Sequence, residues 1–364
     1  MKNTLGDNLR ITIWGESHGP AIGAVLDGIC PGIKVNEDFI NSQLNKRKPM
    51  NKIETTRHED DEFHILSGVF NGYTTGEAIS IIIENKNVHS NDYEQIKNKP
   101  RPSHADYVAY EKYHGYNDYR GGGHFSGRLT AVIVACGAIL IDALRQKNIY
   151  IGTHIKQCFN VYDRDFENVE EDIKSLENKK IPVLNNIEDL VFETIENASK
   201  KHDSVGGILQ TAVNGLPIGL GEPWFSSVES KLAEALFSIG GVKGIEFGSG
   251  FGFAEMLGSE ANDQFISTEI GIKTKTNHNG GINGGISNGM PIIFNLAVKP
   301  TPSIGIKQDT IDLETKENTT LEIKGRHDPA IIRRMSVVVD SITAIVICDL
   351  LSIRYGNDFL NFGE

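Results

Sequence analysis

The apolar segment at residues 129–144 is the sequence feature that most restricts how this chain can fold. Apolar side chains fill the segment almost without interruption, which at this length predicts a helix that is buried on most of its faces. Such a helix needs covering layers, and the rest of the sequence has to supply them.

Strand patterns in both halves of the chain supply such layers. Short apolar runs bounded by Gly, Asn and Pro predict strands at residues 10–14, 21–29, 63–70, 78–83, 205–213, 292–298 and 320–323. Two further helices are predicted at residues 227–239, after a capping box of Ser226 and Glu229, and at residues 341–352. Strand pairs followed by an apolar helix in each half favour an α+β sandwich with helices between sheets over a doubly wound parallel sheet.

The length of 364 residues allows one large domain or two ordinary ones, and we expect residues 1–364 to form a single domain. One stretch, residues 163–190, is rich in Glu, Asp, Lys and Asn and poor in apolar residues. It predicts a solvated excursion within that domain, carrying one amphipathic helix and no chemistry.

The net charge of −12 argues against a non-specific nucleic-acid binder, because affinity for a phosphate backbone comes from clustered Lys and Arg. An anionic small substrate would need local basic clusters. The four cysteines are far apart and lack metal-ligand spacing, which predicts buried free thiols and no metal site. The first residues lack an apolar signal core and no run of 18 or more apolar residues predicts a membrane span, so we expect a cytoplasmic protein.

Glycine is in clear excess, with 38 residues against an average usage of roughly 7%. Gly121, Gly122 and Gly123 lead directly into the apolar segment, and Arg120 and Arg128 flank them. Consecutive glycines leave backbone amides uncovered, and the following helix adds its positive dipole. This stretch therefore predicts a phosphate or flavin site.

A second glycine-rich stretch, residues 277–289, contains two diglycines four residues apart and precedes a strand that leads into residues 299–303. Glycines at this density let the chain approach a flat ligand closely, as an isoalloxazine ring would need. A long loop built of turns is the alternative.

Two histidines occupy positions typical of catalytic groups. His18 follows Ser17 in a glycine turn directly after the first predicted strand. His104 lies between Arg101 and Asp106, which could set its charge so that it serves as a proton donor near pH 7. The alternatives are a turn whose polar side chains bond only to backbone, and a helix cap at Asp106 with His104 exposed.

Two charged clusters are further candidates for binding or catalysis. Arg47 belongs to a run of three cations at residues 46–48, a candidate clamp for phosphate or carboxylate, with a solvated face as the alternative. Asp328 follows Arg326 and His327, which would keep the carboxylate ionised and able to act as a base. An ion-paired turn is the alternative there.

In this order, these segments resemble the chorismate synthase family over nearly the whole chain. The agreement covers residues 15–19, 101–106, 119–123, 277–289, 299–301 and 325–329, and the combination is far more specific than any single motif. The resemblance implies a β-α-β sandwich with helices between antiparallel-rich sheets, assembled as a homotetramer. It also implies that reduced FMN supports the 1,4-elimination of phosphate from 5-enolpyruvylshikimate 3-phosphate to give chorismate, the last step of the shikimate pathway of aromatic amino-acid biosynthesis. NADPH would be a further ligand if the chain reduces its own flavin.

The resemblance assigns proton transfer to His18, His104 and Asp328, with Ser17 and Ser126 in a linking hydrogen-bond network. The implied cofactor contacts are His124, Phe125, Ser126, Gly240, Gly241, Gly284, Lys299, Pro300, Thr301, Pro302, Ser303 and Arg326. The implied substrate-binding residues are Arg47, Arg128, Arg333 and Arg334.

The chain departs from the commonest family pattern at the first glycine turn. His124 and Phe125 replace an Arg-Ser pair, and Leu129 replaces a Glu. The pair Gly240 and Gly241 replaces an Asn-Ala pair. Losing one Arg and one Glu together leaves the net charge unchanged.

Two other functions are weighed against the enzyme. A non-catalytic relative could keep the FMN or anion site as a binding module, but the presence of His18, His104 and Asp328 favours the enzyme. An NAD(P)H-dependent flavin reductase would need a nicotinamide site, for which the sequence shows no motif.

Overall fold

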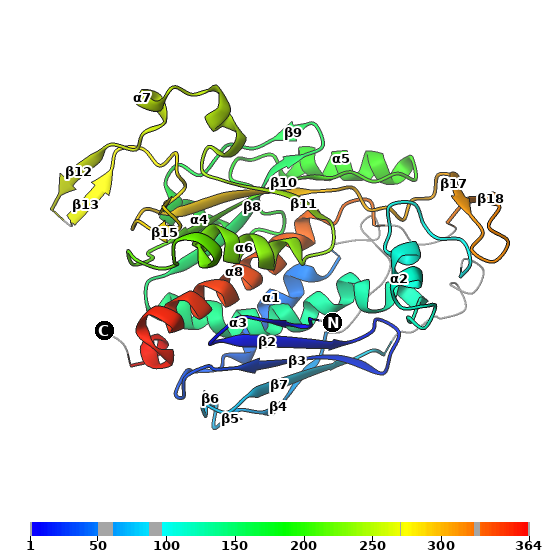
Figure 1. Cartoon of the computed structure of the whole chain (residues 1–364), viewed down its shortest axis with the longest axis horizontal. Coiled ribbons are helices and arrows are strands. Elements are labelled where there is room, and N and C mark those ends of the chain that lie inside the picture. The colour runs from blue at the N-terminus through cyan, green and yellow to red at the C-terminus, as the bar shows by residue number, and fades with distance from the viewer. Residues whose placement is uncertain (1, 50–60, 87–96, 270, 324–327, 363–364) are drawn as a thin grey trace.

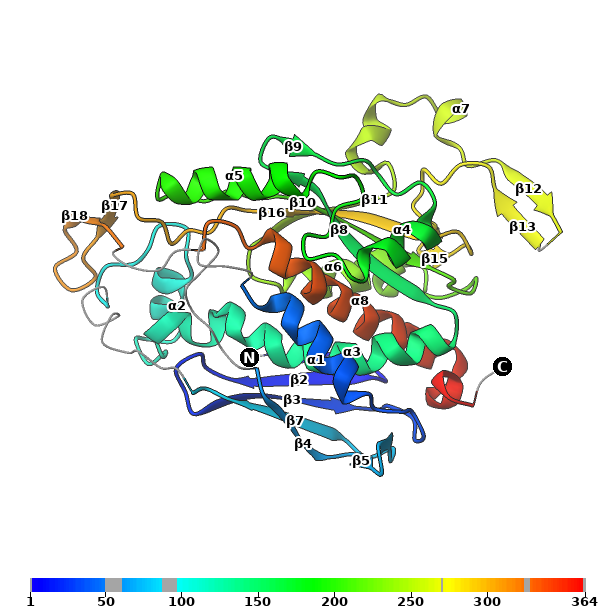
Figure 2. The same cartoon turned by 180° about the vertical axis from the view of Figure 1, so that it is seen from behind.

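The computed structural model describes residues 2–49, 61–86, 97–269, 271–323 and 328–362. Two five-stranded sheets enclose a layer of helices, as Figures 1 and 2 show from opposite sides. The first sheet has the order β1 (Thr4–Leu5), β2 (Arg10–Gly15), β3 (Ala21–Asp27), β7 (Ile79–Glu84) and β4 (Phe63–Ser67). The second has the order β11 (Val242–Phe247), β16 (Ile292–Val298), β10 (Gly207–Asn214), β8 (Tyr150–Cys158) and β9 (Val161–Tyr162).

The central layer contains α1 (Glu37–Arg47), α3 (Thr130–Gln146) and α8 (Ile332–Tyr355). The other helices are α2 (Asp106–Lys112), α4 (Val169–Leu176), α5 (Glu188–Lys200), α6 (Val228–Phe237) and α7 (Gly258–Ala261). Short 3-10 turns include η2 (Arg120–Phe125), η3 (Gly127–Leu129), η4 (Trp224–Ser226), η5 (Gly250–Glu255) and η6 (Asn357–Leu360). Two-stranded ribbons are formed by β5 (Val69–Phe70) with β6 (Tyr73–Thr74), β12 (Phe265–Thr268) with β13 (Gly271–Thr274), β14 (Ile282–Asn283) with β15 (Ile286–Ser287), and β17 (Gln308–Ile311) with β18 (Asn318–Leu321).

The predicted α+β sandwich is confirmed. Within the described ranges, every strand pairing of the two large sheets is antiparallel. The apolar segment forms α3, which packs against α8 and contacts strands of both sheets.

Two local predictions need correction. The helix α6 is capped by Ser227, whose side chain accepts a hydrogen bond from the backbone of Ser230, so the cap lies one residue later than Ser226. The last helix begins at Ile332, nine residues before the predicted start at Ser341, because its polar first turns are buried in tertiary contacts.

The helices α3 and α8 pack closely against each other at Gly137. A Cβ atom on this residue would lie 2.3 Å from Cβ of Ser341 in α8. The missing side chain therefore lets the two helix backbones approach each other, and Ser341 is fully buried at the crossing.

The helical segments at residues 127–146, which include α3, and at residues 332–355, which form α8, are long and apolar enough to span a membrane. However, 78% and 89% of their most apolar windows are buried inside the protein, as expected for core helices. The four cysteines, Cys30, Cys136, Cys158 and Cys348, are free and buried, as predicted.

The C-terminal part of α8 holds the start of the first sheet. The buried carboxylate of Asp349 accepts backbone hydrogen bonds from Asp7 at 3.0 Å, from Asn8 at 2.8 Å and from Leu9 at 2.9 Å. A residue near the end of the chain thus fixes the turn that leads into β2.

A row of polar side chains crosses the second sheet on the face covered by α4. His154, Gln210, Asn295 and Glu246 are register partners on four adjacent strands. His154 Nε2 lies 3.1 Å from the side-chain oxygen of Gln210, and the amides of Gln210 and Asn295 donate to the next residue at 3.0 and 2.9 Å. The side chains of these four residues are thus linked in sequence across the sheet.

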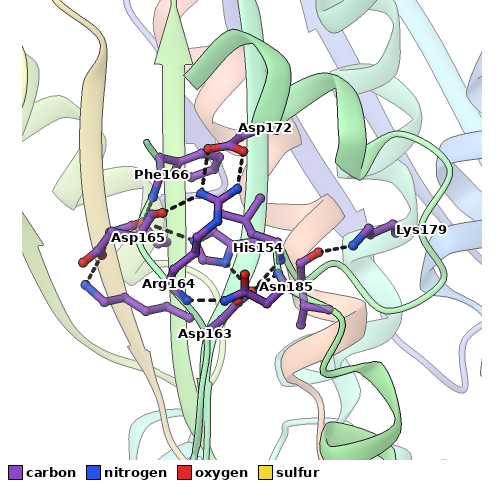
Figure 3. Close-up of polar contacts among 12 residues, drawn as sticks. His154, Asp163, Arg164, Asp165, Phe166, Asp172, Lys179 and Asn185 are labelled. Atoms are coloured by element: carbon purple, nitrogen blue, oxygen red, sulfur yellow. Dashed lines mark hydrogen bonds and ion pairs between the residues drawn. The ribbon is translucent and has the colours of Figure 1, made fainter. Parts of the chain in front are cut away.

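The row is continued by Asp163, in the segment that leads to α4 (Figure 3). The Asp163 carboxylate lies 3.4 Å from His154 Nδ1 and accepts backbone hydrogen bonds from Arg164, Leu184 and Asn185. Burial alone would raise the pKa of Asp163, but the hydrogen bonds from His154 and from the three amides lower it to about 2. The ionised form thus fastens residues 163–185 to the sheet.

We expect Gly137→Ala to destabilise the protein by about 1–3 kcal/mol, because the new methyl group would force α3 and α8 apart. This cost should exceed the gain of about 1 kcal/mol in helix propensity. Thermal unfolding measures the change. Gly258→Ala in α7 is the matched control, since a Cβ there meets nothing within 4 Å; an equal effect of both substitutions would contradict the close packing.

We expect Asp163→Asn to lower the free energy of unfolding at pH 7 by about 1–3 kcal/mol, because three backbone amides lose their ionised acceptor. Since the pKa of Asp163 is lower in the folded state, its contribution is present above about pH 4 and is lost as the pH falls toward 2. Urea unfolding at pH 7, 5 and 3 should therefore show that the difference in the free energy of unfolding between the wild-type protein and the variant becomes smaller as the pH falls. Asp27→Asn, at an exposed carboxylate that ends β3, serves as the control.

Candidate functional site

The three glycines of η2 lie between two of the predicted catalytic histidines. Gly121, Gly122 and Gly123 have φ angles of 60°, 85° and 54°, values that residues other than glycine rarely adopt. A Cβ on Gly121 would lie 2.1 Å from His18 Cε1, and one on Gly122 would lie 3.5 Å from His104 Cε1. Successive glycines therefore bring the two imidazoles to one turn.

His18 is buried and held by its neighbours. Its Nδ1 lies 3.1 Å from Ser17 Oγ, which in turn lies 3.2 Å from the backbone oxygens of Arg120 and Gly121. The Ser17 hydroxyl therefore links the His18 ring to the backbone of the glycine turn. The backbone of Ser17 also donates to Gly123 O at 3.1 Å.

The predicted substrate-binding residues Arg47 and Arg128 meet at one carboxylate. Arg47 Nη1 lies 2.6 Å from Asp61, and Arg128 forms an ion pair with the same buried side chain. Arg47 also donates to Gly127 O at 3.1 Å, next to Arg128. These contacts fix two guanidinium groups at the N-terminal end of α3.

Arg128 is connected to the turn of His18 through Asn85. Arg128 Nε donates to Asn85 Oδ1 at 3.0 Å, and the Asn85 amide donates to the backbone oxygens of Glu16 and Gly19 at 3.0 and 2.9 Å. The cation cluster thus also supports the turn that presents His18.

His104 is not the exposed residue of the helix-cap alternative, because its side chain is only 19% exposed and contacts Asp106. The Asp106 carboxylate lies 2.6 Å from His104 Nδ1 and accepts two hydrogen bonds from the Arg101 guanidinium. Arg101 also donates to Ser303 Oγ at 3.1 Å, which joins this segment to the one after β16.

Lys299, directly after β16, crosses to the same segment. Its Nζ donates to Ser103 O at 2.7 Å, and its backbone donates to Gly241 O at 2.9 Å. Burial lowers the pKa of Lys299, and the nearby Lys243 lowers it further.

Asp328 forms an ion pair with Arg334 in the first turn of α8, and its backbone oxygen accepts a hydrogen bond from Thr301. Arg333 points elsewhere. Its guanidinium donates to the backbone oxygens of Lys46 at 3.1 Å and Lys48 at 2.7 Å, at the C-terminal end of α1.

His124 and Phe125 have different surroundings. His124 Nδ1 lies 2.8 Å from the backbone oxygen of Gly15 at the end of β2. The Phe125 ring is 46% exposed and lies 6.3 Å, centre to centre, from Tyr113. Phe125 lines a cleft with Lys97, Arg101, His104, Asp118, Tyr119 and Gly122, among other residues.

The other predicted cofactor residues lie around this cluster. Ser126 Oγ caps η3 by accepting from the backbone of Arg128. Pro300 is exposed and Pro302 is half-buried on either side of Thr301, and a Cβ on Gly240 would meet nothing within 4 Å. Arg326 lies outside the described residues.

The second glycine-rich stretch does not join the cluster within this chain. Gly284 connects β14 and β15, and its neighbour Gly285 packs against Ser227. This ribbon precedes β16, whereas Lys299 follows that strand, so about 20 Å of strand separates them. The expectation that both glycine-rich stretches line one cavity is not met in a single chain, and a cofactor role for Gly284 stays a prediction.

The sequence model described as chorismate synthase matches residues 9–352. The chain is 46% identical to the chorismate synthase of Pyrococcus abyssi over 349 residues, which cover 96% of this chain and 97% of that protein. It is 45% identical to the chorismate synthase of Thermococcus kodakarensis, with 95% and 96% covered. The chain belongs to the chorismate synthase family. It is therefore an enzyme, as its curated relatives are.

The fold agrees with this assignment. A crystal structure of chorismate synthase matches with a TM-score of 0.76 at 28% sequence identity, over 96% of this chain and 94% of the other. Against the common chorismate synthase pattern, His124 uses its ring to bind the end of β2, and Phe125 adds an aromatic wall to the cleft.

Sequence reasoning missed two site residues and one long-range contact. Asp61 and Asn85 lie in no glycine or histidine motif, and only their contacts with the predicted Arg128 reveal them. Arg101 stood in the motif of His104, but its link to Ser303 joins segments about 200 residues apart and could not be derived from spacing.

We expect Gly121→Ala to lower chorismate formation by about 10²-fold, because the methyl group would displace His18 and a shift of about 1 Å at a reacting centre has an effect of this size. Steady-state turnover measures the loss, and circular dichroism checks the fold. Gly72→Ala is the matched control, since Gly72 also has a positive φ of 80° but a Cβ there meets nothing within 4 Å. A similar loss in both variants would show that backbone strain, not contact with His18, is responsible.

Proposed function

We propose that this chain catalyses the 1,4-elimination of phosphate from 5-enolpyruvylshikimate 3-phosphate to give chorismate, as a carbon–oxygen lyase that requires reduced FMN. The observation that carries the proposal is the meeting of His18 and His104 at successive glycines beside a cleft. A family member that kept only a binding role would not need two imidazoles on one turn.

The reaction breaks the bond from C3 to the phosphate oxygen and the C6–H bond, and it forms a diene without net oxidation or reduction. Anionic phosphate has to leave and one proton has to be removed. The chain therefore has to supply donors for the phosphate and an acceptor for the proton.

His18 has the position to serve the leaving phosphate. Its Nδ1 lies 3.1 Å from Ser17 Oγ, and its ring lies against Gly121, so the imidazole is held at the glycine turn. Arg47 and Arg128 stand behind the same turn, where positive charge stabilises a leaving anion.

Asp328 and His104 are the remaining proton carriers in this scheme. Asp328 would assist proton removal from C6, and its ion pair with Arg334 keeps the side chain fixed in the described structure. His104 would hold or supply a proton on the cofactor side, where it faces Gly122. Arg333 and Arg334 would contribute to substrate binding.

The residues around the cleft fit a flavin. Phe125 offers an exposed aromatic ring beside Gly122, on which a planar ring system can pack, and Lys97 and Arg101 add cations. Lys299, Thr301 and Ser303 reach the same region through Ser103, Asp328 and Arg101. When bound, reduced FMN supplies an electron-rich ring that stabilises an electron-poor substrate.

Several wider features belong to the same proposal. The chain would act in the cytoplasm as a homotetramer, without nucleic acid or membrane partners, as the last enzyme of the shikimate pathway. NADPH would bind only if the chain reduces its own flavin. A binding module and a flavin reductase are the competing functions, and one assay separates all three.

The purified protein is incubated without oxygen with photoreduced FMN and substrate, and chorismate absorbance is followed with and without NADPH. Chorismate formation with photoreduced FMN is the expected result. Formation from oxidised FMN and NADPH as well would make the chain bifunctional. Oxidation of NADPH without any chorismate would indicate a flavin reductase, and no turnover under any condition would indicate a binding module.

We expect His18→Ala and His104→Ala each to lower turnover by about 10²-fold or more, because each removes a proton-transfer group. The same anaerobic assay measures both variants. His202→Ala is the control, since His202 lies in the exposed turn after α5 and outside this cluster. Unchanged turnover in both site variants would remove the two histidines from the mechanism.

A further inference from the structure

We propose that Asp106 is a positioning residue for His104: it fixes the proton on Nδ1 of the imidazole and thereby presents Nε2 to the cleft. The inference deepens the proposed function, because it rests on a proton-transfer role of His104. Sequence reasoning named Asp106 only as a charge near His104, and the inference adds control of the imidazole tautomer.

The contact between Asp106 and His104 is short and charged. Asp106 Oδ1 lies 2.6 Å from His104 Nδ1, while Arg101 Nη2 lies 3.1 Å from the same nitrogen. The two contacts require opposite states of Nδ1. A guanidinium only donates, so its contact needs a lone pair on Nδ1, whereas a carboxylate only accepts, so its contact needs a proton there. The shorter contact decides, because a carboxylate oxygen 2.6 Å from a ring nitrogen needs a proton between the two atoms, while Arg101 Nη2 has Asp106 Oδ1 as an acceptor at 2.8 Å. His104 Nδ1 therefore carries a proton.

This arrangement determines what the other nitrogen can do. In the neutral ring with a proton on Nδ1, Nε2 keeps its lone pair and can accept a proton. Nε2 also faces the glycine turn, since a Cβ on Gly122 would lie 3.7 Å from it. The atom that can exchange a proton is thus directed at the turn that also contacts His18.

Asp106 is itself held in place. Its Oδ2 accepts hydrogen bonds from the backbone of Arg101 at 3.0 Å and from Arg101 Nε at 2.7 Å. Arg101 is in turn tied to Ser303 at 3.1 Å. The carboxylate does not cap its own helix, because α2 has Ala105 at the N-cap position and no side-chain cap. The side chain is therefore committed to Arg101 and His104.

The charge of Asp106 is also secured. Burial alone would raise the pKa of Asp106, but hydrogen bonds from Arg101 and His104 outweigh it and hold the pKa well below its usual range. The carboxylate stays ionised throughout any usual assay. It can therefore orient a neutral imidazole and stabilise an imidazolium without taking the proton itself.

A second buried His–Asp contact in the chain lacks this geometry. His154 lies 3.4 Å from Asp163, and its Nε2 is used by Gln210 within the polar row of the second sheet. In contrast to His104, neither ring nitrogen of His154 faces the cleft. Of these two pairs, only His104–Asp106 directs its second ring nitrogen at the glycine turn of the cleft.

The test compares Asp106→Asn, His104→Ala and the double variant in the anaerobic chorismate assay. We expect Asp106→Asn to lower kcat by about 10²-fold while KM and FMN affinity change less than about threefold, because the amide no longer enforces one tautomer. The double variant should be no slower than His104→Ala alone, since Asp106 acts only through His104. Asp106→Glu should restore part of the rate by returning the carboxylate.

Asp172→Asn is the matched control. Asp172 also binds an arginine through both carboxylate oxygens, at Arg164, but it lies on the far face of the second sheet. Its replacement should leave kcat unchanged. A nitrogen-15 spectrum of histidine-labelled protein gives a readout independent of turnover, with the His104 signals assigned from the His104→Ala variant. The wild-type protein should show a proton on Nδ1, and Asp106→Asn should shift it toward Nε2.

The outcomes separate this inference from the proposed function. Normal kcat and an unchanged tautomer in Asp106→Asn would overturn the positioning role, as would a double variant much slower than His104→Ala. If His104→Ala itself turns over normally, the proposed role of His104 fails. The nitrogen-15 spectra would then still test whether Asp106 positions the ring, because they compare the His104 tautomer in the wild-type protein with that in Asp106→Asn.

Discussion

The packing of α3 against α8 is the contact on which the other layers depend. Both helices are almost wholly buried, and they can approach each other because Gly137 has no side chain where it meets Ser341. The first sheet covers one side of this pair and the second sheet covers the other (Figure 1). A change in the distance between the two helices would therefore move both sheets.

The same helix pair positions the candidate site. α3 begins directly after the glycine turn, and α8 begins shortly after Asp328, so the N-terminal end of each helix adjoins a segment of the candidate site. Helix N-termini carry partial positive charge. The guanidinium groups of Arg47 and Arg128, which share the single carboxylate of Asp61, add positive charge beside the N-terminal end of α3 in a chain with a net charge of −12.

The amount that the sequence could predict follows from how local each signal is. The apolar run of α3 and the strand β16 were predicted closely, because periodicity and flanking turns are properties of neighbouring residues. The first turns of α8 were missed because Arg333 suggests an exposed loop, whereas its guanidinium is buried against the end of α1. Asp61 was missed because its importance lies wholly in contacts with residues distant in sequence.

The contacts of Asp349 have a consequence for the order of folding. This carboxylate receives the amides of residues 7–9, about 340 positions earlier in the chain. During synthesis, the N-terminal sheet emerges long before the residue that fixes its first turn. The turn that leads into β2 must therefore wait until the last helix leaves the ribosome, and the face of α3 that packs on α8 stays uncovered until then. Such long-range closure is slow, and it makes the nascent chain a natural substrate for chaperones that shield apolar surface.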